Sequence, residues 1–362
     1  MGGKTKSDEL NYDRENELNE LMSTKAGVKG LVDSGISYVP RIFKVQQELK
    51  NSEDGNYNEF QVPVISLEGY QGERRQEIVD DILNASKTWG IFQVVCHGVP
   101  SDVMKNMLKS VSEFHEQPRE LKEEFYSHDS ARKVWYYMTV HSVLRSALWK
   151  DTIACQFDDV GTDFRALPLI CRKPMSDFVE HIIKLKEELS KLLCEALGLD
   201  RDHLEKMECM KARKLVGHYY PSCPEPELTM GTPKHSDPYF LTILLQGHVD
   251  GLQVLHQNQW INVQPIDGAL IAIIGDMLQL ISNDMMKSAE HRVLATRRGP
   301  RLSAACFFYP TAVNQKQRFG PLKELLSDDN PALYKEVTHT EYLKHYSLHG
   351  CCGSKPLPDF WL

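Results

Sequence analysis

The chain has 362 residues, a formal net charge of −8, and 41% hydrophobic and 25% charged residues. This length predicts two domains, or one large β core with helical additions, and the acidic balance argues against a general binder of nucleic acid or of anionic membranes. The nine cysteines form no CxxC pair, the start is polar, and no apolar run is long enough to span a membrane, so we expect a cytoplasmic protein.

Residues 1–60 are expected to form a polar N-terminal extension, and residues 61–205 a helix-rich region. Within that region, "VPVISL" (62–67) alternates like a short strand. The helix after it should stop at Gly90, and "IFQVV" (91–95) has the composition of a buried strand. The apolar stripe of that first helix consists of Ile78, Ile82, Ala85 and Trp89.

Two more helices are predicted in the helix-rich region. Ser101 stands in the position of an N-cap for the first of them, and the second spans roughly 174–197 and ends near Gly198. Each carries one apolar face that is expected to point inward. The inward residues are Val103, Met107, Val111 and Phe114 in the first helix, and Phe178, Ile182, Leu185, Leu189, Leu192 and Ala196 in the second.

From about residue 213 the pattern changes to short β-like runs, most of them separated by Gly, Asn, Asp or Pro. This spacing is typical of a sandwich or barrel. We therefore predict a mainly β fold with α additions, in which residues 206–315 form a double-stranded β-helix (jelly roll) core with N-terminal and flanking helices. Residues 316–362 should form a C-terminal helical segment outside the core. The β-like runs are 213–220, 240–246, 251–256, 260–264, 269–274, 290–295 and 301–309.

A candidate metal site lies in "KHSDPYFLTILLQ" (234–246), where His235 and Asp237 are separated by one residue. In an extended segment, positions i and i+2 point to the same side, so both side chains can reach one ion. His291, at the start of a later predicted strand, is the candidate third ligand. Two histidines and one carboxylate that leave three positions open are the facial triad of non-haem Fe(II) oxygenases.

A second HxD pair competes with the first, because "GHVDG" contains His248 and Asp250. The flanking Gly247 and Gly251 are typical of a solvated hairpin tip. A single HxD is weak evidence for a metal site, and spacing alone does not choose between the two pairs. Two histidines and an aspartate also leave a hydrolytic zinc site open at this stage.

The last predicted strand contains a candidate anion site. Strand alternation places one arginine, one hydroxyl and two aromatic rings on the same face. Burying the arginine and the hydroxyl costs free energy unless they hold an anion, and a guanidinium matches a carboxylate in shape. The alternative is a surface strand with a solvated arginine, against which the aromatic neighbours argue. The residues of that face are Arg301, Ser303, Ala305, Phe307 and Tyr309.

Taken together, HxD, a distant His and RxS resemble the plant 2-oxoglutarate- and Fe(II)-dependent dioxygenase family. Four longer segments are also similar to that family's signatures, so the resemblance covers roughly residues 20–362. It is nearest to the branch called 1-aminocyclopropane-1-carboxylate oxidase homologues, which includes hydroxylases of alkaloids and benzoxazinoids. The four segments are 23–43, 92–100, 217–246 and 330–343.

The resemblance implies the roles of seven residues. Three would bind Fe(II): His235, Asp237 and His291. Four would contact 2-oxoglutarate: Arg301, Ser303, Tyr220 and His218. Arg301 and Ser303 would hold its distal carboxylate, while His218 stands where many members of the family have asparagine. The implied co-substrates are 2-oxoglutarate and O₂, with ascorbate as the reductant, and the expected partner is a small molecule bound by a monomer, with no nucleic acid and no membrane.

The implied activity is that of a 2-oxoglutarate-dependent dioxygenase which oxidises a C–H bond of a plant specialised metabolite, such as an alkaloid. Hydroxylation, desaturation, ring closure and O-demethylation are all open outcomes. Halogenation is disfavoured, because the related halogenases lack the carboxylate that Asp237 supplies. Two alternatives remain: a jelly-roll binding protein without turnover, and an oxidase of the ethylene-forming type that uses ascorbate in place of 2-oxoglutarate.

The stretch 134–155 resembles the family poorly, and it reads "LWKD" at 148–151 where relatives tend to have "ANWRD". Because this region helps to wall the substrate pocket in the family, we predict an altered pocket. Aromatic walls suit an apolar or ring-shaped substrate and could hold a cationic amine, although such rings also occur as ordinary core. The expected lining residues are Tyr136, Trp149, Phe307 and Tyr309.

Overall fold

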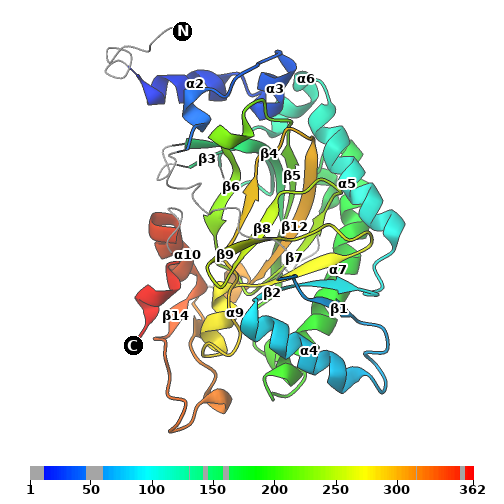
Figure 1. Ribbon diagram of the computed structural model, residues 1–362, viewed down its shortest axis with the longest axis vertical. Coiled ribbons are helices and arrows are strands. Elements are labelled where there is room, and N and C mark those ends of the chain that lie inside the picture. The colour runs from blue at the N-terminus through cyan, green and yellow to red at the C-terminus, as the bar shows by residue number, and fades with distance from the viewer. Residues whose placement is uncertain are drawn as a thin grey trace.

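A computed structural model describes residues 12–45, 60–129, 131–141, 146–157, 163–314, 316–350 and 355–362. Within these ranges, two β-sheets lie against each other and helices cover the outside of the larger one (Figure 1). Of the polar extension expected at 1–60, residues 1–11 and 46–59 lie outside the described residues, while residues 12–45 contain two helices, α2 (Arg14–Ser23) and α3 (Gly27–Asp33). No helix of the described part is both long and apolar enough to cross a membrane.

The helices, in chain order, are α2 (Arg14–Ser23), α3 (Gly27–Asp33), α4 (Arg75–Thr88), α5 (Ser101–Glu116), α6 (Arg119–Lys122), α7 (Leu169–Ala196), α8 (His203–Lys206), α9 (Asp276–Ile281) and α10 (His339–His349). The strands of the larger sheet are β1 (Val64–Ser66), β2 (Ile91–Val95), β3 (Val134–His141), β4 (Ser146–Phe157), β5 (Ala212–Tyr220), β7 (Leu241–Gln246), β10 (Leu270–Ile274) and β12 (Arg301–Tyr309). The smaller sheets contain β6 (Met230–His235), β8 (Leu252–His256), β9 (Gln259–Asn262) and β11 (His291–Leu294), and the pair β13 (Arg318–Phe319) and β14 (Val337–Thr338).

The larger sheet has the order β1-β2-β10-β7-β12-β5-β4-β3, and the sheet facing it has the order β6-β11-β8-β9. All neighbours pair antiparallel except β1 and β2. Apolar side chains from both sheets, such as Val216 and Leu244 on one and Leu252 and Val293 on the other, form one buried cluster between them. The predicted mainly β fold with a double-sheet core is therefore confirmed.

Helices α4, α5 and α7 pack on the outer face of the larger sheet (Figure 1). The predicted apolar stripes are buried there because each helix can turn one face toward the sheet. Two details of the prediction were wrong. Ser101 is the first residue of α5 and makes no cap bond, since Pro100 occupies the N-cap. The long helix begins at Leu169 and includes Pro174, which lacks one amide donor without ending the helix.

Strands β3 and β4 were not predicted, although they form one end of the larger sheet. β4 is buried along almost its whole length, so it shows little of the alternation that marks a half-buried strand. It pairs with β5, and the sheet therefore continues across the boundary expected at residue 205.

The segment that contains His248 and Asp250 does not join two strands of one hairpin. It connects β7 of the larger sheet to β8 of the facing sheet. The flanking glycines led to the hairpin prediction, but β7 and β8 pair with other strands. This connection crosses from one layer of the core to the other.

The C-terminal region is less helical than predicted. Between residues 320 and 338 the chain forms turns and β14, with Pro321 and Pro331 interrupting helix formation. The helix α10 begins only after Thr338, whose side chain forms a capping box with Glu341. α10 lies on the far side of the core from α5 and α7 (Figure 1).

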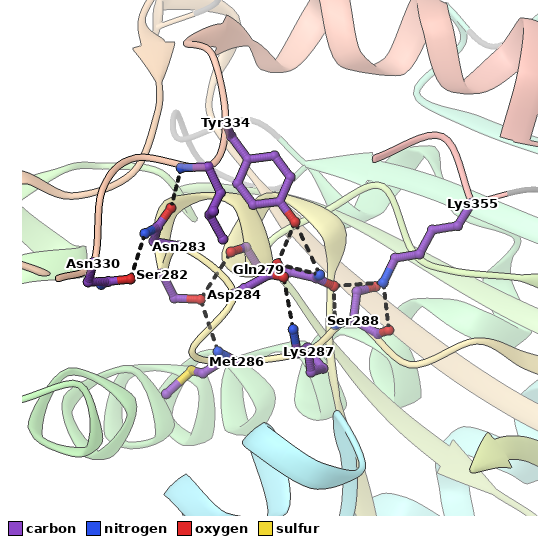
Figure 2. Close-up of polar contacts among 11 residues, drawn as sticks. Gln279, Ser282, Asn283, Asp284, Met286, Lys287, Ser288, Asn330, Tyr334 and Lys355 are labelled. Atoms are coloured by element: carbon purple, nitrogen blue, oxygen red, sulfur yellow. Dashed lines mark hydrogen bonds and ion pairs between the residues drawn. The ribbon is translucent and has the colours of Figure 1, made fainter. Parts of the chain in front are cut away.

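A polar network fixes the C-terminal region to the segment that follows α9. Figure 2 shows Gln279 and Asp284 turned toward the hydroxyl of Tyr334, and Gln279 and Ser288 beside the end of Lys355. Tyr334 donates to Asp284, and Lys355 donates to Gln279 Oε1 at 2.6 Å and to the Ser288 carbonyl at 3.0 Å. The segment so anchored leads directly to β11, on which His291 lies.

Candidate active site

The three candidate metal ligands come together at one end of the smaller sheet. His235 is the last residue of β6 and His291 is the first residue of β11, and the antiparallel register places these two residues opposite each other. Their ring centroids are 4.2 Å apart. Asp237 follows β6 directly, so its carboxylate can turn back toward both rings.

The geometry of the three side chains suits a single ion. Asp237 Oδ1 lies 3.7 Å from His235 Nε2 and 3.9 Å from His291 Nε2. One ligand atom from each of the three residues lies within 4.8 Å of the others, and among the described residues no other group of this kind is found. His248 and Asp250 therefore belong to no such group.

Hydrogen bonds orient each ligand toward the shared point. His235 Nδ1 donates to the Pro233 carbonyl at 2.9 Å, and His291 Nδ1 donates to the Ala289 carbonyl at 3.1 Å. In the neutral form of each ring, this hydrogen bond places the proton on Nδ1 and leaves Nε2 as the nitrogen that can bind a metal. Thr242 Oγ1 donates to Asp237 Oδ2 at 2.6 Å, which leaves Oδ1 free for the ion. Such outer contacts fix the tautomer and orientation of metal ligands.

Burial and the neighbouring His291 hold the pKa of His235 well below its usual range. The ring is therefore neutral at physiological pH, which is the form of histidine that binds metal. Together with the carboxylate, which is 3% exposed, this donor set fits a divalent ion with open positions.

The C-terminal helix α10 supports the loop that carries Asp237. Tyr346 donates from its hydroxyl to the Ser236 carbonyl at 2.7 Å. His339 Nε2 donates to the Pro238 carbonyl at 3.2 Å. Asp276, fully buried, accepts hydrogen bonds from Ser236 and Tyr342. The backbone on both sides of the aspartate is thus held from outside the sheet.

The candidate anion site is built on β12 and β5. Arg301 is 1% exposed, and its hydrogen bonds to Ser303 Oγ and Gln246 Oε1 have the long distances of 3.5 and 3.4 Å. Its Nε is buried without a partner in the described part of the chain. Burial lowers the pKa of Arg301, and Tyr220 and Asp250 oppose this effect. A buried guanidinium with weak protein partners is a site for an anion that the protein does not itself supply.

Two further groups stand beside Arg301. Tyr220 lies with its ring 5.1 Å from the guanidinium carbon, and its hydroxyl is 3.3 Å from Thr232 Oγ1. His218 Nδ1 is 2.9 Å from Thr152 Oγ1. Burial holds the pKa of His218 well below its usual range, with the nearby cations adding to the effect, so this ring is neutral.

All seven of these side chains line one cavity of about 240 Å³ between the two sheets. The candidate metal ligands lie on the smaller sheet and the loop after β6, while the candidate anion site lies on the larger sheet. The other lining residues are Tyr137, Lys150, Lys214, Val216, Thr232, Pro238, Tyr239, Thr242, Leu244, Leu252, Ile273, Val293, Ala305, Phe307 and Tyr346.

Comparison with known proteins agrees with this geometry. A family model described as the 2OG-Fe(II) oxygenase superfamily matches residues 209–310, and one described as the N-terminal region of non-haem dioxygenases in morphine synthesis matches residues 62–168. The chain is 43% identical, over 95% of its length, to 1-aminocyclopropane-1-carboxylate oxidase homolog 1 of Arabidopsis thaliana, of which 96% is covered. The chain belongs to the 2OG-Fe(II) oxygenase superfamily.

Other relatives of this 2OG-Fe(II) oxygenase include a hydroxylase and a solved structure. The chain is 44% identical to deacetoxyvindoline 4-hydroxylase of Catharanthus roseus, over 90% of its own length and 84% of that protein. It is similar to the crystal structure of JOX2 in complex with 2OG, Fe and JA, with a TM-score of 0.81, 30% identity, and coverage of 93% of this chain and 97% of that one. The family, the jelly-roll fold and the dependence on Fe(II) and 2-oxoglutarate are thus shown, as the sequence predicted.

Only one of the four residues expected in the substrate wall lines the cavity. Phe307 does so, with its ring 4.9 Å from that of Tyr239. Tyr136 is instead packed against Phe114 in the cluster under α5, and Trp149 packs against Phe43 beside the N-terminal helices.

Tyr136 and Trp149 miss the cavity because successive residues of a strand point to opposite faces. Tyr137 and Lys150, each one residue further along β3 and β4, point into it instead. Tyr309 is not a lining residue either. It lies at the end of β12, where its ring stacks on His339.

Sequence reasoning missed several lining residues. Lys214 was detectable, since it shares the parity of His218 and Tyr220 on β5. Thr242 lies five residues after Asp237, but only the folded loop shows that its hydroxyl bonds to that carboxylate.

Proposed function

We propose that His235, Asp237 and His291 hold the Fe(II) ion of this dioxygenase. The observation that carries the proposal is the pair of Nε2 atoms facing Asp237 Oδ1, with both Nδ1 atoms engaged by backbone carbonyls. Bound iron would supply the redox chemistry by which O₂ oxidises 2-oxoglutarate, to succinate and CO₂, together with a C–H bond of the substrate. The protein's side chains bind, orient and exclude water.

Arg301 and Ser303 hold the distal carboxylate of 2-oxoglutarate in this proposal. The buried guanidinium supplies the charge and the forked geometry, and its orphaned Nε is available as a further donor. Tyr220 and His218 border the same end of the cavity. A hydrolytic zinc enzyme would give the buried arginine no role, and dependence on 2-oxoglutarate separates the proposal from an ascorbate-using oxidase.

The substrate is a small organic molecule with an apolar or ring-shaped body, oxidised at one C–H bond. Phe307, Tyr239 and Tyr137 supply an aromatic wall on the lining of the cavity. Hydroxylation is the favoured outcome, supported by the printed activity of one relative, deacetoxyvindoline 4-hydroxylase. A monomer with no nucleic-acid or membrane partner remains part of the proposal.

The proposal is tested with purified protein supplied with Fe(II), ascorbate and 2-oxoglutarate. We expect succinate release, and a mass shift in one or more compounds of a plant metabolite extract, only when 2-oxoglutarate is present. The control omits 2-oxoglutarate and keeps ascorbate. Turnover in that control would favour the ascorbate-using oxidase, and absence of succinate in every mixture would favour a binding protein without turnover.

A further inference from the structure

The cavity contains more positive charge than iron and 2-oxoglutarate require. Its lining includes three cations, Lys150, Lys214 and Arg301, and a single carboxylate, Asp237. On the proposed function, a divalent iron ion and a doubly negative 2-oxoglutarate cancel each other. Because the burial of unbalanced charge is costly, the net excess of about two positive charges within the lining residues indicates another anionic ligand.

Lys150 belongs to the 2-oxoglutarate end of the cavity. Its Nζ donates to Thr232 Oγ1 at 3.0 Å and lies 5.9 Å from the centre of the Tyr220 ring. The centre of the same Tyr220 ring also lies 5.1 Å from the guanidinium carbon of Arg301. Lys150 therefore lies beside the proposed carboxylate site, and its charge supplements that of the arginine.

Lys214 lies at a different position along the same sheet. The register places it opposite Gln156 on β4 and opposite Phe307 on β12, so these side chains share one face. Arg301 is opposite Tyr220, six residues further along β5, which corresponds to about 20 Å of strand. The backbone positions of Lys214 and Arg301 are therefore well separated along the sheet, with His218 between them on β5, and Lys214 lies on the side of the aromatic wall.

The ammonium group of Lys214 lacks an anionic partner among the described residues. Its Nζ lies 5.0 Å from the centre of the Trp135 ring, and the described part of the chain gives it neither a hydrogen bond nor an ion pair. Burial, with Lys150 adding to it, lowers the pKa of Lys214 to about 8. The side chain is still mostly protonated at neutral pH, so it remains a charged donor that faces the cavity.

We propose that Lys214 anchors an anionic group of the substrate, and that the substrate is an organic acid whose apolar or ring-shaped body lies against Phe307 and Tyr239. A carboxylate fits best, because a single lysine offers one point charge and no forked pair of donors. A cationic amine is disfavoured, since it would be placed among like charges. Of the substrates that the sequence left open, this favours an apolar or ring-shaped acid over a cationic amine.

A structural role for Lys214 is the competing explanation. The charged Nζ lies 5.0 Å from the centre of the Trp135 ring, and such a cation–π contact stabilises a lysine without any ligand. The two explanations differ in one respect: a packing role predicts no preference for an acid over its neutral or cationic analogue.

Three matched probes of one shape separate these explanations: 3-phenylpropanoate, its methyl ester and 3-phenylpropylamine. Full-length protein is loaded with Mn(II) in place of iron and saturated with 2-oxoglutarate, so the Arg301 site is occupied. Water-proton relaxation first shows that Mn(II) is bound. Binding of each probe near the metal is then measured from the Mn(II)-induced relaxation of its own protons.

We expect the acid to bind at least tenfold more tightly than the amine or the ester. Lys214→Met, which keeps the chain length over Trp135, should weaken binding of the acid by about tenfold to a hundredfold, the typical range for one hydrogen bond to a charged group. Lys214→Arg should retain most of the affinity. Lys184→Met, at an exposed position of α7, is the matched control and should change nothing.

The inference is overturned if the amine or the ester binds as tightly as the acid, if Lys214→Met leaves the acid's affinity unchanged, or if no probe is relaxed by bound Mn(II). If Lys214→Met does not fold, as judged by its thermal unfolding, Lys214→Gln replaces it. Failure of the proposed function has a different signature: no succinate from 2-oxoglutarate with Fe(II), whichever probe is bound.

Discussion

Replacing Arg301 by leucine should raise the dissociation constant of 2-oxoglutarate by a predictable amount. The guanidinium is 1% exposed and its hydrogen bonds to Ser303 and Gln246 are long, at 3.5 and 3.4 Å, so in the proposal the co-substrate carboxylate is its main partner. Removing one member of a buried charged pair typically costs about 2–5 kcal/mol, and each 1.4 kcal/mol corresponds to about tenfold. Because Lys150 leaves a second cation at this end of the cavity, we expect the lower part of that range, roughly 30- to 300-fold.

The assay is direct titration of Mn(II)-loaded protein with 2-oxoglutarate, followed by succinate formation with Fe(II). Arg301→Lys should recover part of the affinity, because it restores the charge without the forked geometry. Arg172→Leu, at an exposed position of α7, serves as the control. Unchanged 2-oxoglutarate affinity in both Arg301 variants, with normal thermal unfolding, would refute the assignment of this site.

Three further outcomes are expected. Thr242→Val removes the 2.6 Å hydrogen bond to Asp237 and should weaken metal binding, measured by Mn(II) titration, by about 10- to 100-fold. Unchanged affinity would show that the loop orients the Asp237 carboxylate without help from Thr242. Phe307→Ala should produce succinate in excess of oxidised product, because a poorly positioned substrate is not attacked, and tight one-to-one coupling would place the substrate elsewhere. Affinity for 3-phenylpropanoate should be full below pH 8 and fall above it, because Lys214, with its pKa of about 8, loses its proton. The same pH series on Lys150→Met removes the contribution of the other cavity lysine, whose pKa burial also lowers. An affinity that does not change with pH would contradict the proposal that Lys214 binds the acid.

The parts of the site that the sequence predicted are those fixed by short-range spacing. His235 and Asp237 are two residues apart at the end of one strand, and their common direction follows from strand geometry. The third ligand, His291, was predicted on a strand start, and that is where it lies. Spacing alone did not choose against His248; the RxS pair and the resemblance to the family did, and among the described residues His248 belongs to no group of three possible metal ligands.

The substrate wall could not be predicted for a specific physical reason. Alternation along a strand tells which residues share a face, but not which face points inward. On β12, Arg301 supplied that phase, and Phe307 was placed correctly in the cavity lining. On β3 and β4 no residue with an expected role in the site showed which face points inward. The prediction therefore named Tyr136 and Trp149, whereas their neighbours Tyr137 and Lys150 face the cavity.

The most direct test of the account is the Fe(II)- and 2-oxoglutarate-dependent release of succinate, measured side by side for the wild-type protein, Asp237→Ala and His248→Ala. Asp237 lies within 4 Å of both ligand histidines, whereas His248 lies on the connection between β7 and β8. The account predicts that succinate release is abolished in Asp237→Ala and unchanged in His248→Ala, with both variants folded. Turnover that survives the loss of Asp237, or that disappears with His248, would contradict it.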